Sequence, residues 1–228
     1  SYFDETEAIV QHLTAMSVTK IAVFYQNDAY GQAGLTGVER ALKKRNLALA
    51  GKATVERNTA DVAKAVADLR QAAPEAVIMI GAYKACAAFI KEMKQAGASP
   101  YFWNVSFVGS KALASELGVS GRGVQVSQVV PFPWDGSIPV VKEYRALLAQ
   151  AKGEPGFGTL EGFIAAKVMV EGIRRAGRSL TRESFIKAME SLDPYDAGGF
   201  KVSYGPDNHN GSTFVDLTII SRDQKFVR

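Results

Sequence analysis

Cysteine and histidine are the scarcest reactive groups in this chain of 228 residues, which has one cysteine and two histidines. The single cysteine, Cys86, can form no internal disulfide and no cysteine-based metal site. It lies in the apolar run 85–90, which predicts a buried core thiol, and a lone cysteine is compatible with the cytosol or with a bacterial periplasm. His12 has no second histidine at metal-ligand spacing, and His209 falls in a predicted turn. We therefore expect no metal ion and no cofactor.

The signatures of nucleotide-binding proteins and of hydrolases are absent as well. The chain has no G-x-x-x-x-G-K-[ST] loop, no G-x-G-x-x-G after a strand and no G-x-S-x-G elbow. Gly31 and Gly34 at the head of a helix are more typical of tight packing between a strand and a helix. The turn 205–211 lacks the ligand alternation of a calcium loop. These absences predict no catalytic residue and argue against an enzyme.

Long apolar runs and basic patches are also missing. No apolar run approaches the length of a membrane span. The net charge of +4 comes from Lys and Arg residues spread along predicted helices, for example at 43–45 and 174–175. No basic stretch is interleaved with aromatic residues as in a base-stacking platform. We expect solvated helix faces and no nucleic-acid partner.

Helices and strands are predicted to alternate from the start of the chain to residue 127. The all-apolar run 76–80 indicates a strand covered on both faces, as in a parallel sheet flanked by helices. The alternation predicts an α/β fold, a doubly wound parallel sheet with right-handed crossovers. The predicted helices are 4–17, 31–45, 61–72, 83–96 and a short one from 110 to about 118; the predicted strands are 20–25, 47–55, 76–80, 101–107 and 122–130. Residues 58–61 offer several candidates for the cap of the third helix.

A different pattern follows residue 136. Three predicted helices, 138–151, 159–176 and 182–192, have no strong strand between them. Each carries an apolar stripe that needs a partner surface. Short strands at 200–204, 213–220 and 225–227 then end the chain. The fold class is therefore a doubly wound parallel sheet plus a helical return segment and C-terminal β strands.

Two tyrosines mark the candidate binding site. Tyr30 and Tyr83 each follow a buried strand at the start of a helix. Loops that leave the carboxyl ends of parallel strands form the ligand crevice of open α/β sheets, so two hydroxyls and two rings are expected at one site. Asp28, just before Tyr30, either caps the helix or touches the ligand. Each tyrosine by itself is also compatible with simple packing on the neighbouring loop.

The order of motifs resembles the type I periplasmic binding proteins, most closely the branched-chain amino-acid binding proteins of ABC importers. The resemblance covers essentially the whole chain. It rests on a strand and loop that open the second lobe of that family, a helix ending in glycine, an aromatic strand with its Gly-Ser loop, an alanine-rich helix, and a turn-rich segment near the end. These pieces are 20–31, 89–97, 101–113, 162–171 and 200–211.

The resemblance implies a division of the chain. Residues 1–127 correspond to the second α/β lobe, residues 128–210 to a crossover segment that packs on the first lobe in the family, and residues 211–228 to return strands of the second lobe. Family members have an opening first lobe that the chain as given lacks. We therefore expect this chain by itself to bind ligand weakly or not at all.

The resemblance also assigns site residues. Tyr30 and Tyr83 fall on ligand-touching tyrosines of the family, and Ser106 falls on the acid that pairs with the ligand's ammonium. A serine carries no charge to neutralise a buried ammonium, so we expect a ligand without an ammonium at this point. Trp103 and Phe107 flank Ser106 and would suit an apolar or aromatic acid, although Trp103 is also compatible with core packing.

The implied function is the solute-binding component of an ABC importer, located in the periplasm. It would bind a small amino acid or carboxylic acid between two lobes that close about a hinge, and its partner would be a membrane permease. Two alternatives stay open from the sequence. One is a ligand-sensing regulatory or receptor domain of the same fold, and the other is a flavodoxin-like α/β enzyme.

Overall fold

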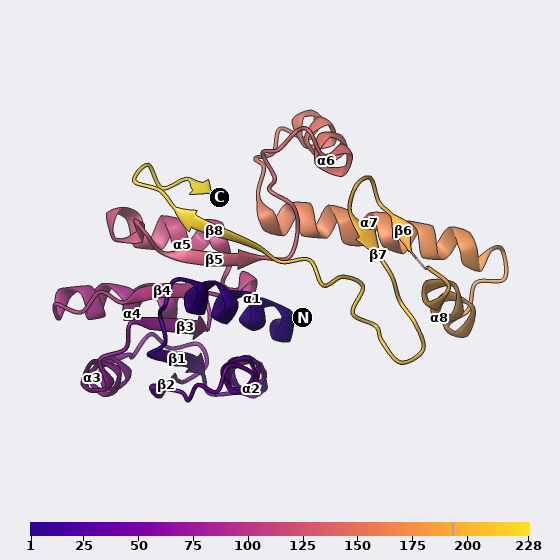
Figure 1. Ribbon diagram of the computed structural model, residues 1–228. Helices are drawn as coiled ribbons and strands as arrows, with labels where there is room; N and C mark the ends of the chain where they lie inside the picture. Colours follow the sequence, from indigo (N-terminus) through magenta and orange to yellow (C-terminus); the bar gives the residue numbers. More distant parts are fainter. Residues whose placement is uncertain (193) are drawn as a thin grey trace. The chain divides into compact units, whose positions relative to one another are not determined.

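The computed structural model describes residues 1–192 and 194–228 and divides them into two compact units. The larger unit comprises Tyr2–Gln128 and Leu217–Arg228. The other comprises Ser1 and Val129–Asp216. Figure 1 traces the chain through both.

A mostly parallel sheet forms the centre of the larger unit. Among the described residues it has seven strands, in the order β2-β1-β3-β4-β5-β8-β9. Strand β1 pairs in parallel with β2 and β3, and the parallel pairing continues from β3 to β4 and from β4 to β5. Strands β8 and β9 are antiparallel to each other. The predicted doubly wound parallel sheet is confirmed. The strands are β1 (Ile21–Gln26), β2 (Gly51–Val55), β3 (Ala76–Ile80), β4 (Tyr101–Asn104), β5 (Gln125–Gln128), β8 (Asp216–Ile220) and β9 (Phe226–Val227).

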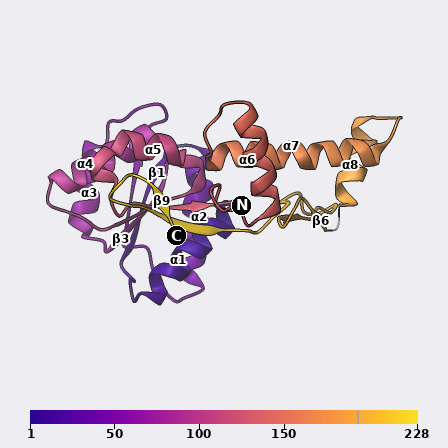
Figure 2. The same cartoon turned by 90° about the horizontal axis from the view of Figure 1, so that it is seen from above.

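Helices cover both faces of this sheet, because the central strands are apolar on both sides. Ile21 and Val23 of β1 lie in the same core cluster as residues of α1 and α2. On the other face, Phe24 stacks on Phe89 of α4 with ring centroids 4.3 Å apart. Figure 2 shows α1 on the opposite side of the sheet from α4 and α5. The helices of this unit are α1 (Tyr2–Ala15), α2 (Ala29–Lys43), α3 (Ala63–Ala72), α4 (Tyr83–Gln95) and α5 (Ser110–Leu117), with 3₁₀ turns at Ser106–Val108 and Gly118–Gly121.

Glycines allow α2 to start directly against the sheet. A Cβ atom on Gly31 would lie 1.8 Å from the main-chain oxygen of Gln26. A Cβ atom on Gly34 would lie 2.5 Å from Cγ1 of Ile80. Neither separation is possible for a real side chain, so the tight strand-to-helix packing predicted from these two glycines is confirmed.

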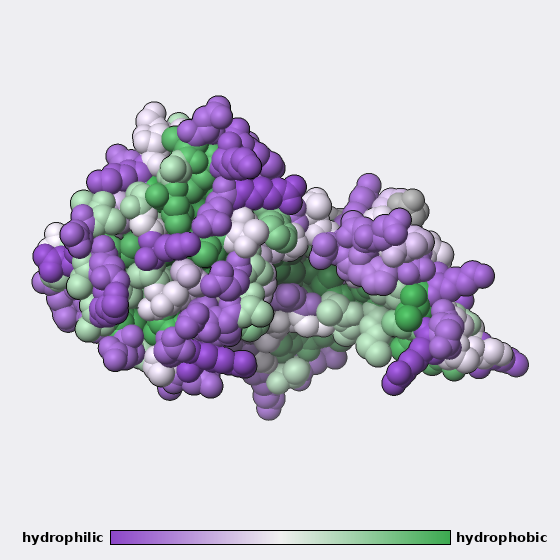
Figure 3. Space-filling view, turned by 90° about the horizontal axis from the view of Figure 1, so that it is seen from below, coloured by the Kyte–Doolittle hydropathy of each residue, from purple (hydrophilic) through white to green (hydrophobic). Residues whose placement is uncertain are grey.

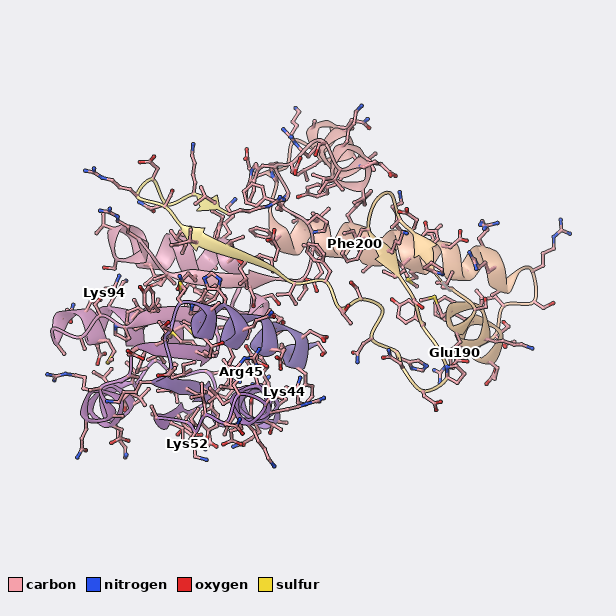
Figure 4. The ribbon with its side chains drawn as sticks, viewed as in Figure 1. Lys44, Arg45, Lys52, Lys94, Glu190 and Phe200 are labelled. Atoms are coloured by element: carbon pink, nitrogen blue, oxygen red, sulfur yellow. The ribbon has the colours of Figure 1, made fainter. Side chains whose placement is uncertain are left out.

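Helices α1 and α2 pack closely and are joined by charges. A Cβ atom on Gly37 of α2 would lie 2.4 Å from Oγ1 of Thr6 in α1. The Glu7 carboxylate of α1 accepts from Lys44 at 2.9 Å and pairs with Arg45 at 2.8 Å; Figure 4 labels both cations. This contact fixes the first turns of α1, which carry part of the candidate site.

The smaller unit consists mainly of α6 (Pro139–Gln150), α7 (Phe157–Ala176) and α8 (Arg182–Glu190), with a two-stranded sheet of β6 (Tyr195–Asp196) and β7 (Lys201–Val202). Helix α8 approaches α7 at Gly172, where a Cβ atom would lie 2.4 Å from Sδ of Met189. Thr181 and Ser184 form a capping box at the start of α8. Hydrophobic residues reach the surface in both units (Figure 3).

Several local predictions from the sequence are wrong in detail. The first helix ends at Ala15 rather than at residue 17, and the second begins at Ala29 rather than at residue 31. The cap of α3 is Val62, which makes no side-chain cap bond, rather than one of residues 58–61. The strand predicted at 101–107 ends at Asn104, because Ser106–Val108 form a 3₁₀ turn.

Candidate functional site

Three loops of the larger unit meet at one edge of the sheet. Strands β1, β3 and β4 are consecutive neighbours and parallel, so their carboxyl ends lie at the same edge. Tyr30 follows β1, Tyr83 follows β3, and Ser106 with Phe107 follows β4. These four residues are the carboxyl-edge cluster. This edge is where ligands bind in open α/β sheets.

Asp28 serves as a helix cap. It precedes α2, and its Oδ1 accepts from the main-chain nitrogen of Gly31 at 3.1 Å. The Gln26 side-chain amide donates to the other oxygen, Oδ2. The hydrogen bond from Gly31 holds the pKa of Asp28 below its usual value. Of the two roles left open from the sequence, the contacts of Asp28 in the structure support the helix cap.

Tyr30 offers its ring rather than its hydroxyl. The ring lies between two others, with centroids 5.2 Å from Tyr2 and 4.9 Å from Phe107. Its hydroxyl is buried and has no hydrogen-bond partner among the described residues. Burial raises the pKa of Tyr30. The expectation of two hydroxyls and two rings at one site stays a prediction, and in this structure the Tyr30 hydroxyl is buried.

Phe107 and Tyr83 are the more accessible members of the cluster. Phe107 is 65% exposed, although it is an aromatic residue in a short 3₁₀ turn. Tyr83 is half-buried at the first position of α4. Together with the ring of Tyr30, they give this edge an aromatic surface.

Trp103 belongs to the core instead. It is 1% exposed in the middle of β4 and is part of the cluster between the sheet and helices α1 and α2. Its ring lies edge-on to that of His12, with centroids 5.4 Å apart. Trp103 is therefore covered by core side chains, and Tyr30 packs against the same core cluster. The reason is that β4 directs Trp103 to the face that α1 covers.

Glu5 is the site residue that sequence reasoning missed. It lies in the first turn of α1 and is only 2% exposed. Its Oε2 accepts from the main-chain nitrogen of Ser106 at 2.7 Å and from Oγ of Ser127 at 2.6 Å. Its Oε1 lies 3.2 Å from Oγ of Ser106. A carboxyl group thus sits directly behind Ser106.

The electrostatic environment of Glu5 contains opposing effects. Burial raises the pKa of Glu5 above its usual value, and the hydrogen bonds from Ser127 and Ser106 partly offset that rise. The only sequence signal was an acidic residue in the first turn of a helix. Such residues are common on exposed helix starts, so this signal could not identify a buried one.

The described part of the chain holds neither a metal site nor a membrane-spanning helix. No group of three or more His, Cys, Asp or Glu side chains there is arranged to hold a metal ion. No helix in residues 1–192 or 194–228 is both long enough and apolar enough to cross a membrane. Cys86 is fully buried, which confirms the predicted core thiol.

A family model described as "Periplasmic binding protein" matches residues 1–224. A search of curated proteins found no significant match.

Solved structures share the fold over the whole chain. A possible leucine/isoleucine/valine-binding protein from Rhodopirellula baltica SH 1 is 33% identical with a TM-score of 0.93, and the match covers 100% of this chain and 64% of that one. A substrate-binding periplasmic protein from Ralstonia solanacearum is 34% identical with a TM-score of 0.88, and the match covers 98% and 65%. A branched chain amino acid ABC transporter protein from Thermus thermophilus with bound valine is 16% identical with a TM-score of 0.83, which shows the fold alone. The chain thus spans less than two thirds of the length of the first two relatives.

Proposed function

The chain belongs to the periplasmic binding protein family, and from that premise we propose that it is part of the solute-binding component of an ABC importer. Its ligand is a small amino acid or carboxylic acid. Relatives at 33% and 34% identity are described as a possible leucine/isoleucine/valine-binding protein and a substrate-binding periplasmic protein, which supports this ligand class. The protein acts in the periplasm, and its partner is a permease in the membrane.

The single observation that carries the proposal is the carboxyl-edge cluster. Tyr83, Ser106 and Phe107 extend from adjacent strand ends, and the ring of Tyr30 supports Phe107. Such a surface combines aromatic area with a few polar groups, as small-molecule sites do. This combination favours binding over catalysis as the function.

We assign the parts of the chain to the flytrap arrangement as follows. Residues 1–127 form the second lobe, residues 128–210 form a crossover segment, and residues 211–228 return to the second lobe. Ligand bound at the carboxyl-edge cluster favours the closed form, because only that form lets both lobes contact the ligand.

The test is calorimetry on the full-length protein with L-leucine, L-valine and benzoate. Tyr83→Ala and Phe107→Ala should each weaken binding of the preferred ligand by about 1–3 kcal/mol through lost ring packing and hydrogen bonding. Tyr101→Ala is the matched control, because Tyr101 is 48% exposed and opens β4 at the opposite edge of the sheet. Unchanged affinity in both site variants would contradict the proposed site.

Two further measurements separate the alternatives. A regulatory or receptor domain of the same fold would bind the same ligands, but deleting its gene would leave uptake of the labelled ligand intact. A flavodoxin-like enzyme would convert the ligand, so product formed over multiple turnovers would reject a binding function.

A further inference from the structure

Glu5 and Ser106 are joined by two contacts between the same pair of residues. The main-chain nitrogen of Ser106 donates to Oε2 of Glu5 at 2.7 Å, and Oγ of Ser106 lies 3.2 Å from Oε1. Ser127 adds a third contact, from its hydroxyl to Oε2 at 2.6 Å. The residues are about a hundred positions apart in sequence, so this arrangement exists only in the folded chain.

The protonation state of Glu5 decides what Ser106 can offer to a ligand. A serine hydroxyl has one hydrogen to donate and two lone pairs, whereas an ionised carboxylate can only accept. When Glu5 is ionised, the hydroxyl hydrogen of Ser106 is therefore directed to Oε1. The main-chain N–H is already bonded to Oε2. Only acceptor lone pairs are left on Ser106.

The hydrogen bonds to Glu5 favour its ionised form and oppose the effect of burial. Two neutral donors, the Ser106 N–H and the Ser127 hydroxyl, converge on one of its oxygens, and donors to a carboxylate stabilise its charged form. Glu5 also lies in the first turn of α1, where the helix dipole is favourable to an anion. The charge stays within one hydrogen bond of the carboxyl-edge cluster.

We propose that Glu5 is a positioning residue that makes Ser106 a hydrogen-bond acceptor and thereby selects ligands with a donor, above all an ammonium, at this point of the edge. The inference rests on the proposed function and narrows its ligand class. It reverses the expectation from the sequence that the ligand has no ammonium beside Ser106. That expectation considered the serine alone, whereas the structure places a carboxylate directly behind it.

The substitution Glu5→Gln should change the Ser106 hydroxyl from a hydrogen-bond acceptor to a hydrogen-bond donor toward the ligand. The Ser106 N–H requires an acceptor at the Oε2 position, so the amide oxygen occupies it. The amide NH₂ then lies at the Oε1 position and donates to Oγ of Ser106. The Ser106 hydroxyl hydrogen is released from this pair and can be donated to a ligand.

The experiment compares two probes with one carbon skeleton in the full-length protein at neutral pH. L-valine has an ammonium donor where 3-methyl-2-oxobutanoate has a carbonyl acceptor. The wild type should prefer valine, and Glu5→Gln should shift the ratio of the two dissociation constants toward the oxo acid by on the order of tenfold, as expected for one hydrogen bond to a charged group.

The matched control is Glu7→Gln, which removes the same charge from the same helix. Glu7 is paired with Lys44 and Arg45 and has no contact with Ser106 among those described. It should leave the ratio of dissociation constants unchanged. A ratio within about twofold of wild type in Glu5→Gln, or an equal shift in Glu7→Gln, would overturn the proposal.

A second measurement does not depend on any ligand. Thermal unfolding of Glu5→Gln, Ser106→Ala and the double variant forms a double-mutant cycle. We expect the shifts in Tm to be non-additive by about 2 °C or more, because each single change alters the same hydrogen bond. If the Tm shift of the double variant equalled the sum of the two single shifts, the proposed hydrogen bond between Glu5 and Ser106 would be refuted. If the wild type binds neither probe, the proposed ligand class fails, while the cycle still decides the pairing.

Discussion

Gly31→Ala is the sharpest test of how the sheet positions the carboxyl-edge cluster. Gly31 is the third residue of α2, directly after Tyr30. A Cβ atom there would lie 1.8 Å from the oxygen, 2.8 Å from the carbon and 3.0 Å from the nitrogen of Gln26 in the main chain. No rotamer can relieve a clash with main-chain atoms, so β1 and α2 must separate by more than an ångström.

The expected magnitude follows from two opposing effects. Alanine in place of glycine in a helix is favourable by about 0.5–1 kcal/mol. Overpacking of a close contact costs about 1–3 kcal/mol, and more where the main chain must move. The separation also strains the cap bond from Gly31 to Asp28. We expect a net loss of about 1–2.5 kcal/mol, or roughly 2–10 °C in Tm.

Gly162→Ala is the matched control. Gly162 is also helical, in α7, but a Cβ atom there would meet nothing within 4 Å. It should raise Tm by about 1–4 °C, because only the helix preference acts. Unfolding is followed by circular dichroism and by Trp103 fluorescence in a Trp134→Phe background, since Trp103 is buried in the unit that contains Gly31. Equal behaviour of the two alanine variants would refute the reasoning.

Two further predictions concern stability. Tyr30→Phe should raise the unfolding free energy of the ligand-free protein by about 0.5–2 kcal/mol, because the hydroxyl is buried without a partner among the described residues; a chemical-denaturation series that shows a loss would contradict this. Glu75→Ala should lower Tm at pH 7, and its difference in Tm from the wild type should shrink as the pH falls below 4.5. The Glu75 carboxylate accepts from the main-chain nitrogens of Lys20 and Thr19, which hold its pKa below the usual 4.5. A folded-state pKa below the unfolded one gives stability that is present above the unfolded pKa and lost as pH falls through the folded pKa. If the Tm difference between the wild type and Glu75→Ala stayed constant from pH 7 to acidic pH, the charge of the Glu75 carboxylate would have no role in stability.

The parallel sheet and the placement of the cluster residues were predictable from sequence. The apolar run at β3 can be satisfied only by burial on both faces, and alternation with helices requires parallel neighbours. Gly31 and Gly34 at the start of a helix likewise indicated that α2 approaches the sheet closely, because only a residue without a Cβ atom fits there. Once the strand order is parallel, Tyr30, Tyr83 and Ser106 must share one edge.

The orientation of individual side chains could not be predicted in the same way. Trp103 points into the core and the Tyr30 hydroxyl is buried because α1 and its neighbours cover that face, which depends on contacts between distant segments. The spacing of apolar residues along the sequence indicates whether a segment is a helix or a strand. It does not indicate which distant segment covers each of its faces.

What the sequence by itself determined is the fold and the sheet edge that the candidate site residues share, because strand periodicity and loop position are local properties. Only the tertiary structure decided the chemistry of that edge. It brings the carboxylate of Glu5 to within 2.7 Å of the Ser106 nitrogen across about a hundred residues. A helix residue that looks solvent-facing in the sequence thereby becomes a buried carboxyl group behind Ser106. Its burial is set by the packing of α1 on β5 and the β4 loop rather than by its neighbours in the chain.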